Sequence, residues 1–415
     1  MEMISKLKKE NILIFSLFTL IILFPISYLL GNSVINLFLF LISLTYLFYL
    51  IKNKKIDEFK KSSFLILFTL WITFLINLFV SQNFDLSLNR VLKFIFIIFF
   101  VSAIKFIISY KNYFFENYIY KIWSLIFLIV LFDLVFEYIF GHNILGNKSS
   151  MPGRLTGFLD GELVIGYYFI GFALFAFIFL DKEIDNKNYT VFILITFILV
   201  SFIIGERSNF IKFCISSLVF FLIVYEINLK KKIIGVLITV SIFSILFFTI
   251  SNDNIYKTRF INQMPNLLEK NGIKKFMLNS TYGSHYNTAL SVFKNNIIFG
   301  VGIKNYRNES VKKIYTDQNK NFKFQIMGTH PHQIHLEFLS ETGIFGYLSF
   351  FSFIIYSLYL SLSSFLKSKN YYQLAAILFV ICSLIPLLPS GSFFSTYTST
   401  LFWFNYAIMM AYTKN

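Results

Sequence analysis

Residues 11–31 read NILIFSLFTLIILFPISYLLG, a run without a charged side chain. A helix of this length crosses the roughly 30 Å hydrocarbon core of a bilayer. Lys6, Lys8 and Lys9 precede it, as in a signal peptide, but no small-residue cleavage site follows and the apolar run is too long for one. We therefore expect residues 11–31 to remain in the protein as a membrane span.

The composition extends this interpretation to the whole chain. Of 415 residues, 56% are hydrophobic and only 14% are charged, which excludes a water-soluble globular protein. The net charge of +16 would suggest nucleic acid as the partner of a soluble chain, but here the cations cluster between apolar runs, as in membrane proteins, and we expect no nucleic acid. Cys214 and Cys382 both lie inside apolar runs, so neither a disulfide framework nor a thiolate metal site is expected.

Apolar stretches of membrane-spanning length recur along the chain. They predict an all-α, polytopic integral membrane protein with about twelve transmembrane helices and one long loop that contains a helix. The expected organisation is nine spans in residues 1–250, the long loop in residues 251–335 and three spans in residues 336–415. The spans centre on residues 11–31, 33–51, 63–80, 90–109, 118–140, 163–180, 189–205, 208–227, 233–250, 336–363, 371–388 and 396–412.

Lysine and arginine are distributed unevenly between alternate loops. If the amino terminus is cytoplasmic, the inside segments carry 18 of these residues, and the short outside loops carry four. The positive-inside rule then places both termini in the cytoplasm and residues 251–335 on the outer face. Loops of this length are uncommon unless they are functional. Within this one, Ala289, Leu290 and Phe293 predict a short amphipathic helix over Ser284–Asn296.

Four of the five histidines lie in this loop or at its end: His285, His330, His332 and His335. Pro331 favours a helix start immediately after it, which would put His332 at the mouth of the tenth span. An imidazole titrates near ~6.5, so a neutral His332 could take a proton from a hydroxyl. Two alternatives stay open. His332 could merely cap or anchor the helix, or His330, His332, His335 and Glu337 could bind a metal, although they do not share one helix face cleanly.

Three arginines, Arg154, Arg207 and Arg307, are expected on the same outer face. A guanidinium at headgroup depth can bind a phosphate through paired hydrogen bonds. Each could instead contact lipid headgroups, or Arg207 could pair with Glu206. Their occurrence together beside the histidines favours a phosphate site. Gly343 and Gly346, three residues apart, predict close packing between membrane helices.

The motifs resemble those of one family. His332-Gln333, nine residues and Gly343-x-x-Gly346 are similar to the histidine signature of the bacterial O-antigen ligases and O-antigen polymerases. The segment from His285 to Arg307, with Gly300-Val301-Gly302, resembles the family's periplasmic loop. The stretch Arg154-x-x-Gly157 followed by Glu162-x-x-x-Gly166 resembles the motif that opens a span in many members. Gln333 stands where asparagine is commoner, and Ile334 where an aromatic residue is usual.

The resemblance implies a glycosyltransferase of the bacterial inner membrane whose active site faces the periplasm. Such an enzyme takes a glycan from undecaprenyl diphosphate and passes it to lipid A-core, for a ligase, or to a second carrier-linked glycan, for a polymerase. The implied general base is His332. Arg207, with Arg154 or Arg307, would stabilise the departing diphosphate, and His285, His330, His335 and Glu162 would support the site. We expect inversion at the anomeric carbon, no metal and no other cofactor. A lipid-linked glycan flippase is the alternative from another class.

Overall fold

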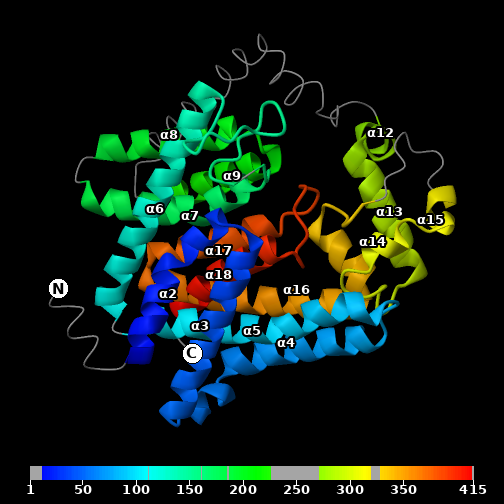
Figure 1. Ribbon diagram of the computed structural model, residues 1–415, viewed down its shortest axis with the longest axis horizontal. Helices are drawn as coiled ribbons and strands as arrows, with labels where there is room; N and C mark the ends of the chain where they lie inside the picture. The colour runs from blue at the N-terminus through cyan, green and yellow to red at the C-terminus, as the bar shows by residue number, and fades with distance from the viewer. Residues whose placement is uncertain are drawn as a thin grey trace.

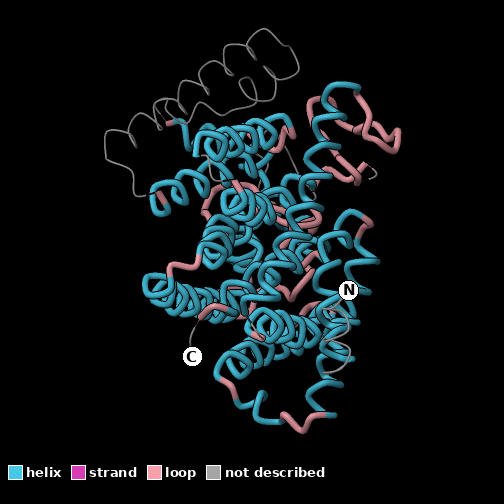
Figure 2. The backbone as a smooth tube through the Cα atoms, turned by 90° about the vertical axis from the view of Figure 1, so that its left-hand side faces the viewer, coloured by secondary structure: helices cyan, strands magenta, loops and turns pink. Residues whose placement is uncertain are grey.

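The computed structural model describes residues 12–110, 112–159, 161–184, 187–225, 271–318 and 328–413, and every regular element within these ranges is a helix (Figures 1 and 2). The all-α prediction is therefore confirmed. The first part comprises α2 (Ile12–Leu29), α3 (Asn32–Lys52), the 3₁₀ helix η1 (Ile56–Lys60), α4 (Ser62–Phe79), α5 (Phe84–Ser109), α6 (Asn112–Phe140), α7 (Ile165–Glu183), α8 (Lys187–Ile203) and α9 (Arg207–Val224). After residue 270 come α12 (Gly272–Asn279), α13 (Thr281–Asn295), α14 (Tyr306–Glu309), α15 (Lys313–Gln318), α16 (Ile334–Ser368), α17 (Tyr371–Ser383) and α18 (Thr396–Ala411).

The helices make this a multi-pass membrane protein. Among the described residues, seven helices are long and apolar enough to cross a membrane: α2, α3, α5, α6, α7, α9 and α16. Three further apolar helices, in α4, α8 and α17, are shorter. The predicted span at 233–250 lies outside the described residues, and each of the other predicted spans overlaps one helix. The count of twelve and the three-part organisation stay predictions.

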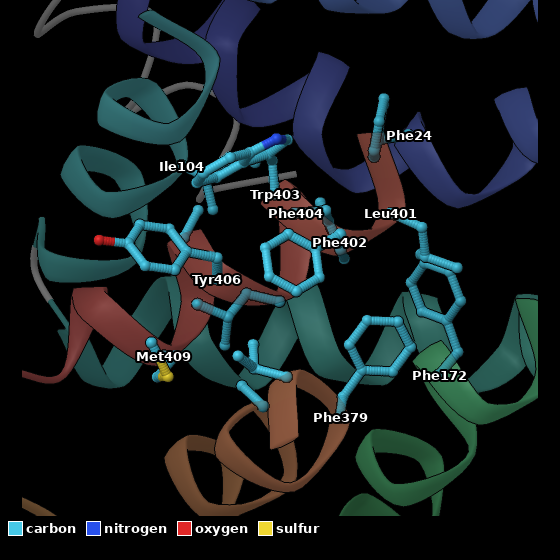
Figure 3. Packing of buried hydrophobic residues seen from close by; sticks show 14 of the residues in the cluster. Phe24, Ile104, Phe172, Phe379, Leu401, Phe402, Trp403, Phe404, Tyr406 and Met409 are labelled. Atoms are coloured by element: carbon cyan, nitrogen blue, oxygen red, sulfur yellow. The ribbon is translucent and has the colours of Figure 1, made fainter. Parts of the chain in front are cut away.

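Helix α18 forms the centre of the bundle. Its residues from Thr400 to Met410 are all buried, and it packs against α3, α5, α7, α16 and α17. Figure 3 shows Trp403 and Phe404 among the aromatic and aliphatic side chains of this core. Trp403 contacts Phe94 edge-on at a ring-centroid distance of 5.4 Å. Since lipid is as apolar as these side chains, close packing rather than exclusion of water stabilises the contacts within the bilayer.

Residues 271–318, here called the polar segment, lie at one end of the bundle. In Figure 1, α12 to α15 are at the right-hand end, beside the end of α4 and the start of α16. The predicted amphipathic helix is confirmed as α13, which buries Ala289 and Val292 in a small core of its own with Val301, Tyr306 and Tyr315. The helix thus folds the polar segment into a compact unit beside α16.

Helix α16 is broken at Gly343, whose backbone has φ 66° and ψ −170°. The polar segment pairs with the backbone groups around this break. Ile344 and Phe345 donate N–H bonds to the carbonyls of Ile297 and Ile298, at 2.8 and 3.1 Å. In return, the N–H groups of Val301 and Gly302 donate to the carbonyls of Ser340 and Glu341, at 3.0 and 2.8 Å.

The prediction that Gly343 and Gly346 pack against another membrane helix was wrong. A Cβ at Gly343 would clash with the carbonyl of Ile298 in the polar segment, and one at Gly346 would meet the side chain of Thr342 in the same helix. Close approach is required at Gly343, but the partner is irregular backbone. Irregular backbone pairs in this way where a buried helix loses its own hydrogen bonds, because unpaired backbone groups away from water cost free energy.

Replacing Gly343 by alanine should therefore destabilise the fold. Gly343→Ala combines an unfavourable positive φ with a clash against backbone, and we expect a loss of roughly 2 kcal/mol or more. Gly141→Ala is a matched control, because Gly141 has φ 74° but a Cβ added there would meet nothing within 4 Å. The measurement is the unfolding temperature of each detergent-purified protein. Equal decreases in the two variants would contradict the role given to the contact at Gly343.

Candidate functional site

The start of α16 fixes the position of His332. Gln333 caps this helix, because its side-chain oxygen accepts the N–H of Leu336 at 2.8 Å. His332 precedes the cap in a left-handed conformation, with φ 56°. Its carbonyl accepts the N–H of Ser390 from the α17–α18 loop at 2.8 Å. The backbone of His332 is thus fixed by a hydrogen bond to the α17–α18 loop and by the capped helix that follows it.

Three imidazoles, those of His285, His330 and His332, lie together and are called the histidine cluster below. The ring centroid of His332 is 4.0 Å from that of His330 and 4.6 Å from that of His285. Tyr282 flanks His332 at 6.1 Å. Gly328 packs against His285, since a Cβ there would lie 2.8 Å from its ring. The structure therefore brings together three of the four histidines predicted for the site.

The cluster favours neutral imidazoles. Burial lowers the pKa of His285 to about 4, and the neighbouring His332 contributes to this decrease. Burial also lowers the pKa of His330 to about 3, helped by His332, Lys304 and Arg307. Burial lowers the pKa of His332 as well. A neutral imidazole has a free nitrogen lone pair, so near neutral pH these rings can accept a hydrogen bond from a hydroxyl.

His335 lies apart from the cluster. Its Nε2 hydrogen-bonds the carbonyl of Leu384 at 2.8 Å, its Nδ1 pairs with the hydroxyl of Tyr347 at 3.1 Å, and its ring stacks on Phe351. The Nε2 bond therefore joins α16 to the end of α17, and the Nδ1 bond lies within α16. The alternative of a metal site built from His330, His332, His335 and Glu337 was wrong, because among the described residues no group of three or more His, Cys, Asp or Glu side chains could hold a metal ion.

Next to the polar segment is a cavity of about 410 Å³ with a cationic lining, called the cationic cavity below. Four cations line it: Arg90 and Lys93 from α5, Lys304, and Arg307 from α14. Asn36, Asp85, Leu86, Asn89 and Thr396 complete the lining. Only one of these lining groups is a carboxylate, so the concentrated positive charge favours an anionic ligand.

Hydrogen bonds between α5 and the polar segment bring the four cations together. The Ser87 hydroxyl donates to the carbonyl of Ile303 at 2.7 Å and accepts from the amide of Asn305 at 2.9 Å. Arg90 lies one helical turn beyond Ser87. Arg90 and Lys93 both donate to the hydroxyl of Thr396 at the start of α18, at 3.3 and 3.0 Å. Lys93 also donates to the amide oxygen of Asn36. Their charges thus meet only neutral partners in these bonds.

The cationic cavity and the histidine cluster are electrostatically connected. Lys304 and Arg307 line the cavity and also lower the pKa of His330. The decrease in the pKa of His330 requires both cations to be near this imidazole, because Coulomb interactions weaken with distance. A ligand anion in the cavity would therefore be close to a group that can accept a proton.

Of the three arginines predicted from the sequence, only Arg307 lines this cavity. Arg154 instead pairs with Glu206 at 3.3 Å and donates to the carbonyl of Leu163. Glu206 also accepts the N–H of Gly166 at 3.0 Å. These bonds hold the loop before α7 against the turn before α9. The Glu206–Arg207 pair considered from the sequence is thus replaced by a Glu206–Arg154 pair.

Arg207 is the first residue of α9, and the residue after it connects this helix to the cluster. The side-chain hydroxyl of Ser208 donates to the carbonyl of Pro389. The N–H of Ser390, the residue after Pro389, donates to the carbonyl of His332. Arg207 therefore begins a helix that is two hydrogen bonds away from the histidine cluster. Glu162 is exposed in the loop before α7 and lines neither this cavity nor the smaller one beside it.

Sequence reasoning did not identify Arg90, Lys93 and Lys304 as site residues. In the sequence, Arg90 is one of the four cations of the short outer loops, and Lys93 lies within the predicted span 90–109. One available signal was their spacing, because two cations three residues apart at the end of an apolar helix share a face and are costly in lipid. Such a pair of cations indicates a functional surface but does not identify the ligand that binds there.

Residues 190–351 match the model of a protein family described as O-antigen ligase. The match runs from α8 into α16 and includes Arg207, Lys304, Arg307 and the histidine cluster. It supports the O-antigen ligase family, as the histidine signature predicted. No curated protein matches the chain.

The histidine cluster should make the fold sensitive to acid. An unfolded imidazole titrates near ~6.5, and those of His285 and His330 titrate lower in the fold. Between these values the unfolded chain binds more protons, so their contribution to stability is lost as the pH falls from about 6.5 towards 4. We expect the unfolding temperature to decrease over this range.

A double variant tests the assignment. His285→Gln/His330→Gln should show a flatter dependence of unfolding temperature on pH than the wild type, whereas His142→Gln, outside the cluster, should retain the wild-type dependence. If the double variant lost stability on acidification as steeply as the wild type, the imidazoles would not be responsible.

Proposed function

Starting from the O-antigen ligase family, which the match over residues 190–351 supports, we propose that the protein is a membrane glycosyltransferase. Its donor is a glycan linked to undecaprenyl diphosphate, and its acceptor is a sugar hydroxyl. The observation that carries this proposal is the proximity of a cavity lined by four cations to a cluster of imidazoles that favours the neutral form, because Lys304 and Arg307 line the cavity and also act on His330.

The reaction needs both parts of the site. The acceptor oxygen attacks the anomeric carbon, the bond from that carbon to the phosphate oxygen breaks, and the diphosphate leaves with the bonding electrons. The acceptor proton passes to His332, which acts as general base. In-line attack inverts the anomeric centre. Outside the cytoplasm there is no ATP, so the donor must carry its own leaving group, and a lipid diphosphate does.

Arg307, Arg90 and Lys93 are the proposed ligands of the diphosphate. Fixed cations aimed at the oxygens where charge develops stabilise the transition state more than the ground state. A smaller cavity, of about 30 Å³, shares Arg90 and Lys93 and is lined by aromatic side chains of α4, α5 and the α17–α18 loop. The cationic lining would bind the phosphate of a lipid-linked donor, and the aromatic lining beside it would contact the lipid chain. The proposed chemistry requires no cofactor.

The other predicted residues take secondary roles in the proposal. Arg207 would approach the donor from the α9 side, supported by its connection through Pro389 and Ser390 to His332. Arg154, paired with Glu206, would hold the loop before α7 rather than contact the donor. His285 and His330 would keep His332 in place, and Glu162 stays a sequence-based prediction for this site.

For the acceptor we propose lipid A-core, which makes the protein an O-antigen ligase. The competing function is O-antigen polymerase, which would join carrier-linked repeats with the same residues. We place the protein in the bacterial inner membrane, with both termini cytoplasmic and the histidine cluster facing the periplasm. The excess of Lys and Arg in alternate loops supports this orientation. A flippase of lipid-linked glycans would use the cationic cavity but would not need a general base.

Replacing His332 should abolish transfer without unfolding the protein. His332→Asn suits this test, because asparagine tolerates the left-handed backbone that His332 adopts but is no base. In cells that lack the wild-type gene, we expect this variant to leave the surface lipopolysaccharide without the transferred glycan, while His142→Asn restores it. The readout is the lipopolysaccharide pattern on a gel. Normal glycan attachment by His332→Asn would contradict the proposed base and would favour the flippase.

The same gels distinguish ligase from polymerase. Loss of a ligase leaves bare core and full-length polymer on the carrier. Loss of a polymerase leaves core that carries a single repeat, and that pattern would replace the proposed acceptor by a carrier-linked glycan.

Arg307→Met should impair use of the donor rather than the fold. Since Arg307 is exposed and lines the cationic cavity, its loss removes a charge-assisted contact with phosphate. We expect kcat/KM for the lipid diphosphate donor to fall by about tenfold or more with little change in unfolding temperature. Arg154→Met should instead lower the unfolding temperature and change kcat/KM little, because it breaks the ion pair with Glu206. A wild-type kcat/KM in Arg307→Met would remove this arginine from the donor site.

A further inference from the structure

A buried chain of polar groups ends at Lys304. The ammonium of Lys304 donates to the hydroxyl of Ser392 at 2.5 Å, and this hydroxyl donates in turn to a carboxylate oxygen of Glu337. The second oxygen of Glu337 accepts the N–H of Phe393 at 2.7 Å. All three polar side chains are buried, with exposures of 7% for Lys304, 6% for Ser392 and 0% for Glu337. The chain joins the polar segment, the α17–α18 loop and the first turn of α16.

Keeping Lys304 in this place is unfavourable in itself. Its backbone adopts a left-handed conformation, with φ 67°, which costs free energy for a residue with a side chain. Its N–H bonds the carboxylate of Glu341 at 2.8 Å, which fixes the backbone in that conformation. Burying a lysine and a glutamate is also costly unless they compensate each other. A buried lysine that served stability alone would not need the strained backbone.

Lys304 also lines the cationic cavity, and in this it differs from its neighbours. Arg90 and Lys93 hydrogen-bond the neutral groups of Thr396 and Asn36, whereas Lys304 is connected through one hydroxyl to a buried carboxylate. An ammonium has three N–H donors. Within the described part of the chain, Ser392 is the hydrogen-bond acceptor of this ammonium, which leaves donors for a ligand in the cavity.

We propose that Lys304 is a further phosphate-binding residue of the donor site and that Glu337, acting through Ser392, is the residue that positions it. This inference rests on the proposed function, because it takes the ligand of the cationic cavity to be the diphosphate. Glu337 lies in the first turn of the helix whose start also fixes His332. The start of α16 therefore fixes the positions of both the general base, His332, and the buried cation, Lys304, relative to the reacting bond.

Binding of inorganic pyrophosphate to the detergent-solubilised full-length protein tests the inference, with calorimetry as the measurement. We expect Lys304→Met to weaken binding by about tenfold, as for loss of one charge-assisted hydrogen bond, and Lys304→Arg to restore part of it. Lys312→Met is the matched control. Lys312 belongs to the same polar segment but is exposed and paired with Glu309 at 2.5 Å, so its variant should bind as the wild type does.

A double-mutant cycle separates positioning from a merely structural role. Glu337→Gln alone should weaken pyrophosphate binding, but in the Lys304→Met background it should cause no further loss, because the group that it positions is gone. Losses that add in the double variant would overturn the role of Glu337. If Lys304→Met alone fails to fold because it leaves a buried carboxylate unpaired, the double variant is charge-balanced, and comparing its affinity with that of Glu337→Gln gives the effect of Lys304.

Arg307→Met distinguishes failure of this inference from failure of the proposed function. If Arg307→Met weakens pyrophosphate binding while Lys304→Met and Glu337→Gln bind as tightly as the wild type, the cavity is a phosphate site and the inference alone is wrong. If the wild type does not bind pyrophosphate, or if its affinity is unchanged in all of these variants, the donor site itself is wrong, and the inference falls with it.

Discussion

The break of α16 at Gly343 is the constraint on which the site depends. Gly343 and the three residues before it are buried, and buried backbone N–H and C=O groups that lose their helical partners must find others, because an unpaired group costs free energy. The polar segment supplies them, through residues 297–302 on either side of the break. This pairing fixes the polar segment along α16 to a single register. Lys304 and Arg307 follow directly in the chain, so their positions are set by the same register.

The same short segment is also held from the other side. The amide of Asn77 in α4 donates to the carbonyl of Phe299 at 2.6 Å and accepts the N–H of Ile303 at 3.2 Å, and Ser87 in α5 bonds Ile303 and Asn305. Figure 1 shows α4 and α5 running beside α16 towards this end of the bundle. Three helices thus meet on one piece of irregular backbone, and one of them, α5, lines the cationic cavity together with Lys304 and Arg307.

Much of the fold and part of the site could be predicted from the sequence. Long apolar runs predict helices because few other structures satisfy the backbone in lipid, and Pro331 marks the start of α16. The grouping of His285, His330 and His332 was predicted because all three fall in the one long loop expected from the sequence, although His335, which is closer in sequence to His332 than His285 is, lies apart. The cations were not, because Ser87 and Ile303, which bring α5 to the polar segment, are 216 positions apart. Arg154 and Arg90 look alike in sequence, and only tertiary contacts assign one to Glu206 and the other to the cavity.

The two halves of the site also depend on each other through charge. Lys304 and Arg307 help to lower the pKa of His330, which keeps protons away from the cluster. An anion bound in the cavity would offset part of this positive potential, so the affinity of His330 for a proton would rise. On the proposed function, the donor diphosphate is that anion. His330, whose ring lies 4.0 Å from that of the proposed base His332, would then bind a proton more readily when the donor is in place.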